Sequence, residues 1–331
     1  MRHLRNAAIL LGVLALAPSA LADDSSATLG AGGLVLTHNA DIRMASEDLY
    51  LSPKAVRVRY AFVNDSDKDI DTIVAFPLPD AVLPDLFEGD NGVQSRHSPN
   101  FVDFRLMVDG ATVPTTGDER AMLNGRDVTA KLRAAGLPIN LINTDLRARL
   151  EKLTPAQKKA LATAKLIDDG GAGQVVPLWT ALTKFWWRQH FGAHKTVIID
   201  HSYTPVSGQS FFGLSAFEDS TMSQVKDYCI DAPTRAAIDR KLEPLARQSA
   251  GVMLNAYYTD FVIVTANNWK SPIGRFHLTL DKLKPDNILS LCWDGDLKKT
   301  SATRFEATRL NFAPRHDIKM MVLFSAAEDA L

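Results

Sequence analysis

The sequence predicts an α+β protein with antiparallel, β-sandwich-like sheets, a helical insertion and one crossing helix. Segments rich in alternating or β-branched residues mark strands in both halves of the chain, for example over residues 55–63 and 195–203. Between them, over about residues 118–184, helix-start and helix-stop signals dominate. A second helical segment, residues 233–248, lies among the later strands. Runs of strands that are separated from the helices are typical of α+β proteins.

The first 22 residues have the layout of a cleaved secretory signal peptide. Arg2 and Arg5 form a short basic start, and an apolar run without charge follows over residues 7–17. Ala20 and Ala22 are small residues at the two positions that a signal peptidase reads. The apolar run is shorter than the roughly 20 residues that span a bilayer comfortably. We therefore expect cleavage after Ala22 and export to the periplasm.

Length and charge exclude some classes of protein. Of the 331 residues, 309 remain after removal of the first 22, which suits two domains or one large elaborated domain. The chain has 37 basic and 38 acidic residues, a near-neutral balance that argues against a nucleic-acid-binding protein. A second long apolar segment is absent from the sequence, so we expect no membrane span after signal cleavage.

The two cysteines, Cys229 and Cys292, are expected to form one disulfide. An even pair of cysteines in an oxidising compartment favours this interpretation over two separate buried thiols. The sequence contains no Cys-x-x-Cys motif, so a redox-active pair is not favoured.

The N-terminal part, residues 23–117, is expected to be rich in β-structure. In residues 55–63 apolar and basic side chains alternate, so that one face of the strand is apolar: Val56, Val58, Tyr60 and Phe62. A polar turn at 64–67 and a second strand at 70–76 predict a hairpin, which Pro77 ends because proline cannot donate to a ladder. Another strand is predicted at 101–108, followed by the turn Asp109-Gly110.

Residues 118–184 are expected to form a mostly helical insertion. Residues 127–135 read as a short helix, with Gly136 just beyond its end. Thr154, Pro155 and Gln157 form a capping box with proline at the first helical position, which predicts a helix to about residue 166.

The C-terminal part, residues 185–331, is expected to contain strands and one helix. The helix covers residues 233–248 and is expected to be kinked or shortened at Pro244. The predicted strands are residues 195–203, 260–265, 276–280, 288–293, 302–312 and 318–324.

Several stretches together resemble the secreted bacterial domain-of-unknown-function family 4424. They are residues 47–53, 56–60, 64–69, 75–79, 201–206, 228–229, Trp269 and 290–292. The resemblance extends from about residue 32 to residue 324, and residues 187–194 depart from it. It implies an exported envelope protein and supplies no catalytic residues.

No group of residues forms a recognised metal or cofactor motif, and we predict no cofactor. His190 and His194 have the spacing of a zinc pair on a helix, but Gly192 lies between them and the His-Glu-x-x-His pattern is missing. Asp67, Asp69 and Asp71 lack the glycine and the terminal glutamate of an EF-hand loop, which favours a solvated turn. His201 is expected to be a hydrogen-bonded residue of the core or of a strand edge.

The aromatic residues Trp179, Trp186 and Trp187 are candidates for binding a ligand or a partner. Core packing that joins the helical insertion to the sandwich is the alternative, and it is favoured.

The function predicted from these observations is that of a non-catalytic periplasmic binding or assembly module. Its partner would be an unknown envelope protein or a small ligand. The alternative is a hydrolase acting on envelope glycans or peptides, which requires a cleft with two convergent carboxylates or a buried Ser–His pair. A bare sheet edge or an exposed apolar groove would instead favour a binding module.

Overall fold

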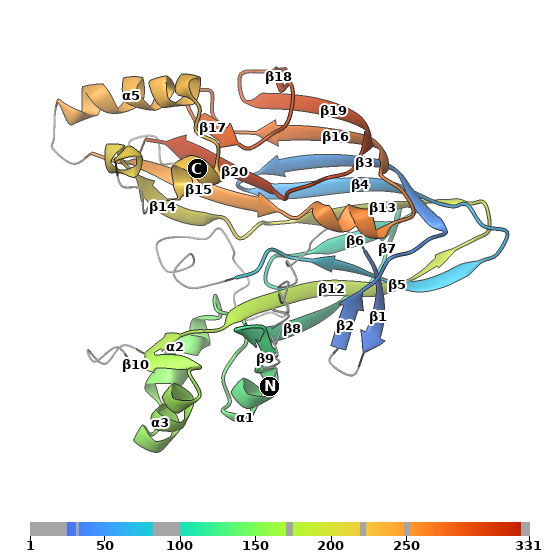
Figure 1. Cartoon of the computed structure of the whole chain (residues 1–331), viewed down its shortest axis with the longest axis horizontal. Coiled ribbons are helices and arrows are strands. Elements are labelled where there is room, and N and C mark those ends of the chain that lie inside the picture. The colour runs from blue at the N-terminus through green and yellow to red at the C-terminus, as the bar shows by residue number, and fades with distance from the viewer. Residues whose placement is uncertain are drawn as a thin grey trace, which may run out of the picture.

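The computed structural model describes residues 25–30, 33–81, 100–169, 175–218, 223–247 and 252–325. The predicted signal peptide, residues 1–22, lies outside these ranges. Antiparallel sheets form most of the described structure and the helices are few, which confirms the predicted α+β class (Figure 1).

The largest sheet, which we call the central sheet, has eight strands. In spatial order they are β18 (Lys298–Lys299), β19 (Arg304–Phe312), β16 (Ile273–Asp281), β3 (Ile42–Ser52), β4 (Ala55–Asn64), β13 (Thr196–Tyr203), β6 (Arg105–Val108) and β7 (Ala111–Thr112). The strands β3 and β16 pair in parallel, and the other neighbours in this sheet are antiparallel.

Two further sheets accompany the central sheet. The six-stranded sheet consists of β2 (Gly33–Leu36), β1 (Ser25–Gly30), β5 (Ile70–Pro77), β12 (Thr180–Phe191), β8 (Thr116–Leu123) and β9 (Arg126–Asp127). The four-stranded sheet consists of β14 (Gly208–Phe212), β15 (Leu254–Phe261), β20 (Ile318–Phe324) and β17 (Ile288–Leu291). A small separate ladder joins β10 (Ile167–Asp169) and β11 (Val175–Pro177).

The core lies on one face of the central sheet and is shared by all three large sheets. The apolar row predicted for β4 is buried, with side chains no more than 2% exposed: Val56, Val58, Tyr60 and Phe62. The same core cluster includes Phe76 and Phe185 of the six-stranded sheet and Met320 and Val322 of the four-stranded sheet. The apolar face of the central sheet therefore packs against both smaller sheets.

The predicted hairpin of residues 55–76 is wrong. Strand β4 pairs with β3 and β13 in the central sheet, whereas β5 pairs with β1 and β12 in the six-stranded sheet. The turn between them therefore crosses from one sheet to the other. Two strands that each bury one face can pair edge to edge or pack face to face, and the periodicity of the sequence does not distinguish these arrangements.

Three short helices lie in the predicted insertion: α1 (Thr129–Ala134), α2 (Thr144–Glu151) and α3 (Pro155–Thr163). The capping box of Thr154 and Gln157 is present, and Gly136 after α1 has a φ of +70°. The buried indole of Trp179 donates a hydrogen bond to the Ile139 carbonyl at 3.0 Å. The boundaries predicted at residues 118 and 184 fall inside β8 and β12, which pair with each other.

The remaining helical elements lie in the C-terminal part of the chain. They are η1 (Leu214–Phe217), α4 (Gln224–Asp227), α5 (Ala232–Ala246) and η2 (Val264–Asn268). Helix α5 corresponds to the helix predicted at 233–248 and contains Pro244. The predicted strand at 260–265 is only partly correct, since β15 ends at Phe261 and η2 follows. Among the helices described, none is both long enough and apolar enough to cross a membrane.

The predicted disulfide is present. Cys229 and Cys292 are bonded, with their Cα atoms 5.0 Å apart. Cys229 precedes α5 and Cys292 follows β17, so the bond joins the start of the helix to the edge of the four-stranded sheet.

His201 is buried in the core, where four aromatic rings surround its imidazole. The ring centroids lie 5.0–5.4 Å away and belong to Tyr60, Phe76, Phe104 and Trp187. Burial lowers the pKa of His201 to about 3, so the folded protein holds a neutral imidazole.

The burial of His201 predicts acid sensitivity of the fold. The unfolded chain takes up a proton at this histidine near pH 6.5, whereas the folded chain does so only near pH 3. The free energy of unfolding therefore keeps its full value above about pH 6.5 and decreases as the pH falls toward 3. Between pH 7 and pH 5 the decrease is about 2 kcal/mol. Urea unfolding at both pH values should show that His201→Gln lacks this loss. The exposed control His38→Gln should retain it, and equal pH dependence in all three proteins would contradict the assignment.

The disulfide predicts a second effect on stability. Its cysteines are 63 residues apart, so replacing both by serine should lower the free energy of unfolding by roughly 4 kcal/mol in the chain-entropy model. Urea unfolding with and without dithiothreitol measures this. Reductant should bring the wild type to the midpoint of the double variant and leave the variant unchanged. A wild type that is indifferent to reductant would show that the bond does not constrain the chain.

Candidate functional site

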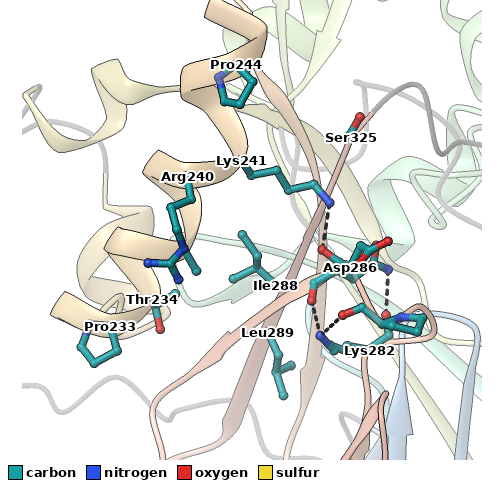
Figure 2. Close-up of a pocket in the computed structure, with 13 residues that line it drawn as sticks. Pro233, Thr234, Arg240, Lys241, Pro244, Lys282, Asp286, Ile288, Leu289 and Ser325 are labelled. Carbon is teal, nitrogen blue, oxygen red and sulfur yellow. Dashed lines mark hydrogen bonds between the residues drawn. The ribbon is translucent and has the colours of Figure 1, made fainter.

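An open groove lies between α5 and the edge of the four-stranded sheet (Figure 2). Its volume is about 700 Å³, which is within the range of small-molecule sites. It is lined by Pro233, Thr234, Ala237, Arg240, Lys241 and Pro244 of α5, by Lys282, Pro285, Asp286 and Asn287 of the loop before β17, by Ile288 and Leu289 of β17, and by Ser325 after β20.

One wall of the groove is a face of α5. The lining positions recur three and four residues apart, as expected for one face of a helix. A different face carries Ile238 and Leu242, which pack on Met321 and Leu323 of β20 and fix the helix to the sheet. Asp231 caps the helix start by accepting a hydrogen bond from the Thr234 amide at 2.8 Å.

The opposite wall is the loop of residues 282–287, which is held by its own buried lysine. The ammonium of Lys282 donates to the carbonyls of Pro285 and Asn287, and the Asn287 side chain donates back to the Lys282 carbonyl at 2.7 Å. Leu283 has a φ of +72°, a conformation that is strained for a bulky residue. Its amide is held by the carboxylate of Asp281 at 2.9 Å. These bonds fix the loop in one conformation.

Two links hold the walls together. The Lys241 ammonium donates to the Asp286 carbonyl at 2.8 Å across the groove, as Figure 2 shows. Near the start of α5 the disulfide joins Cys229 to Cys292, and the Ser290 hydroxyl donates to the Tyr228 carbonyl at 2.8 Å. The distance between the walls is therefore set by covalent and hydrogen bonds.

The groove carries more positive than negative charge. Arg240, Lys241 and Lys282 line it together with one carboxylate, Asp286, a formal balance of three minus one, or +2. Burial, followed by the charge of nearby Lys299, lowers the pKa of Lys282. Arg240 is exposed and forms no ion pair within the described residues.

The side-chain oxygen of Asn287 is a further polar feature of this site. The residue is 2% exposed, and its Oδ1 atom accepts no hydrogen bond from the part of the chain that the structure describes. Because the atom itself is buried, it lies behind the surface of the groove and is not exposed to a ligand there.

The three tryptophans singled out in the sequence lie elsewhere. Trp179 and Trp187 are 1% and 3% exposed, in the insertion cluster and the central core respectively. Trp186 is half-buried and packs against a small cluster that includes Ile73 and Ala75. Trp179 and Trp187 are therefore packed in the interior of the protein.

The structure brings together two polar groups that the sequence analysis treated separately. His190 of β12 lies 2.9 Å from Asp71, its cross-strand neighbour in β5. His194 lies 2.8 Å from Asp67, and this contact ties the turn after β12 to the turn after β4. Asp69 accepts a hydrogen bond from the Ala193 amide at 2.8 Å. Within the described ranges, no set of three or more His, Cys, Asp or Glu side chains could hold a metal ion.

The groove itself has no signal in the sequence. Helical periodicity shows a second face on α5, but the opposite wall lies about 40 residues further along the chain. The two segments meet through the pairing of β17 with β20, the packing of α5 on β20 and the disulfide.

Comparisons with known proteins identify a family. A family model described as "Domain of unknown function (DUF4424)" matches residues 22–321. No curated protein matches the sequence. Among solved structures, a Legionella pneumophila protein named as a candidate nutrient-binding protein is 14% identical with a TM-score of 0.44, over 91% of this chain and 72% of that chain. An M1 zinc metallopeptidase of Deinococcus radiodurans is 5% identical with a TM-score of 0.28, over 87% and 44% respectively.

Both structural similarities are too weak to carry an argument about function. The family match is different in kind, because it spans most of the chain and agrees with the resemblance seen in the sequence. The protein therefore belongs to the family of the domain of unknown function DUF4424.

Proposed function

We propose that this protein is an exported, non-catalytic binding protein of the periplasm that holds a small ligand in the groove between α5 and β17. The observation that carries the proposal is a groove of about 700 Å³ whose two walls are fixed before any ligand arrives. A site that is already ordered loses less conformational entropy on binding, which favours affinity.

Export is supported by two independent features. The first 22 residues have the layout of a signal peptide, and the disulfide between Cys229 and Cys292 suits an oxidising compartment.

A role as an assembly module for an envelope protein is the second candidate. Strand β14 is an edge of the four-stranded sheet, and its Phe211 is 61% exposed. An unpaired edge with an apolar side chain is a surface on which another chain can add a strand.

The hydrolase alternative finds less support in the groove. Glycoside hydrolysis commonly uses two carboxyl groups across a cleft, and Asp286 is the one carboxylate among the lining residues. Among acidic residues elsewhere in the fold, Glu47 is buried in the central sheet, and Asp48 pairs with Arg275 at 3.0 Å. Neither of them lines the groove.

Filling the groove should abolish ligand binding. Ala237→Phe places an aromatic ring on the groove-facing side of α5, while Ala148→Phe, on the exposed face of α2, is the matched control. Each protein is dialysed against the small-molecule fraction of a periplasmic extract, and retained compounds are identified by mass spectrometry. We expect a compound that the wild type and Ala148→Phe retain and that Ala237→Phe loses. Retention of nothing, or equal retention by all three folded proteins, would overturn the proposal.

A further inference from the structure

From the charges and hydrogen bonds that line the groove, we infer that its ligand is a small anion. The anionic group is a carboxylate or a phosphate. This inference rests on the proposed function and adds the chemical class of the ligand.

The charge of the groove is the first argument. Three cationic side chains come from two different elements, Arg240 and Lys241 from α5 and Lys282 from the facing loop. A ligand between the walls is therefore close to positive charge on both sides. Asp286 offsets one of these charges, so the balance of +2 disfavours a cationic ligand.

The availability of donors is the second argument. Arg240 is exposed and unpaired among the described residues, so its guanidinium can form two parallel hydrogen bonds with a carboxylate or a phosphate. Lys241 already bonds the Asp286 carbonyl, which holds its ammonium at the groove rather than in solvent. Lys282 is 7% exposed and bonded to its own loop, so it contributes charge at the wall rather than a free donor.

The test uses isothermal titration calorimetry of the full mature chain in 10 mM salt with four probes: malate, glycerol 3-phosphate, glucose and putrescine. Low salt is required because screening weakens attraction between exposed charges. We expect malate or glycerol 3-phosphate to bind, and glucose and putrescine not to bind. Which anion binds more tightly distinguishes a carboxylate ligand from a phosphate ligand.

Single substitutions test which side chains of the groove contribute to binding of the anion. Arg240→Gln should weaken binding of the anion about tenfold, in keeping with the loss of a charge-assisted hydrogen bond. Asp286→Asn should change affinity in the opposite direction, about threefold tighter, since it removes the opposing carboxylate. Arg247→Gln, just beyond α5 and outside the lining set, is the matched control and should leave affinity unchanged.

The outcomes separate this inference from the function on which it rests. Binding of glucose or putrescine that Ala237→Phe abolishes would overturn the anionic class while leaving the groove as a ligand site. Anion binding that is equally weakened by Arg240→Gln and Arg247→Gln would show only general surface attraction and would also overturn it. Failure of all four probes, together with an empty dialysis result, would overturn both proposals.

Discussion

Strand β20 buries both of its faces, and this double burial joins the core of the protein to the groove. Met320 and Val322 point into the core shared with the central sheet, whereas Met321 and Leu323 lie beneath α5. All four side chains are fully buried. A slip of one residue would exchange the two pairs between two differently shaped surfaces, so the packing on both faces opposes a change of register. The position of α5, and hence one wall of the groove, is therefore set by the same strand that closes the core.

The opposite wall is fixed by a different kind of interaction. A buried ammonium loses its hydration, and this loss is offset only where several acceptors replace the water. Lys282 meets this condition with carbonyls of its own loop, so the lysine and the loop each depend on the other's conformation. The strained backbone of Leu283 persists because these bonds and the carboxylate of Asp281 surround it. The wall is thus ordered by polar contacts, whereas the α5 wall is ordered by apolar packing.

Local signals allowed correct predictions of local structure. The alternation in β4 and the capping box at Thr154 depend on residues that are neighbours in the sequence. The disulfide could be predicted because two cysteines allow only one pairing. The wrong prediction of a β4–β5 hairpin has the opposite origin, since it required knowing which face each strand would bury and against what. The groove could not be predicted for the same reason, because it depends on contacts between distant segments. Its charges come from segments about 40 residues apart, and Arg240 and Lys282 have no motif that links them.

The composition of the chain also conceals the charge of the groove. The formal net charge of the whole sequence is −1, and this near-neutral balance argues against an extended nucleic-acid surface. An average over 331 residues, however, says nothing about four side chains that share one groove. At physiological ionic strength the field of a charge decays over about 8 Å, so a ligand within the groove responds to the local cluster and not to the net charge of the molecule. A near-neutral protein can therefore hold a site selective for anions, provided that the cations are held close together by the fold, as α5 and the loop before β17 hold them here.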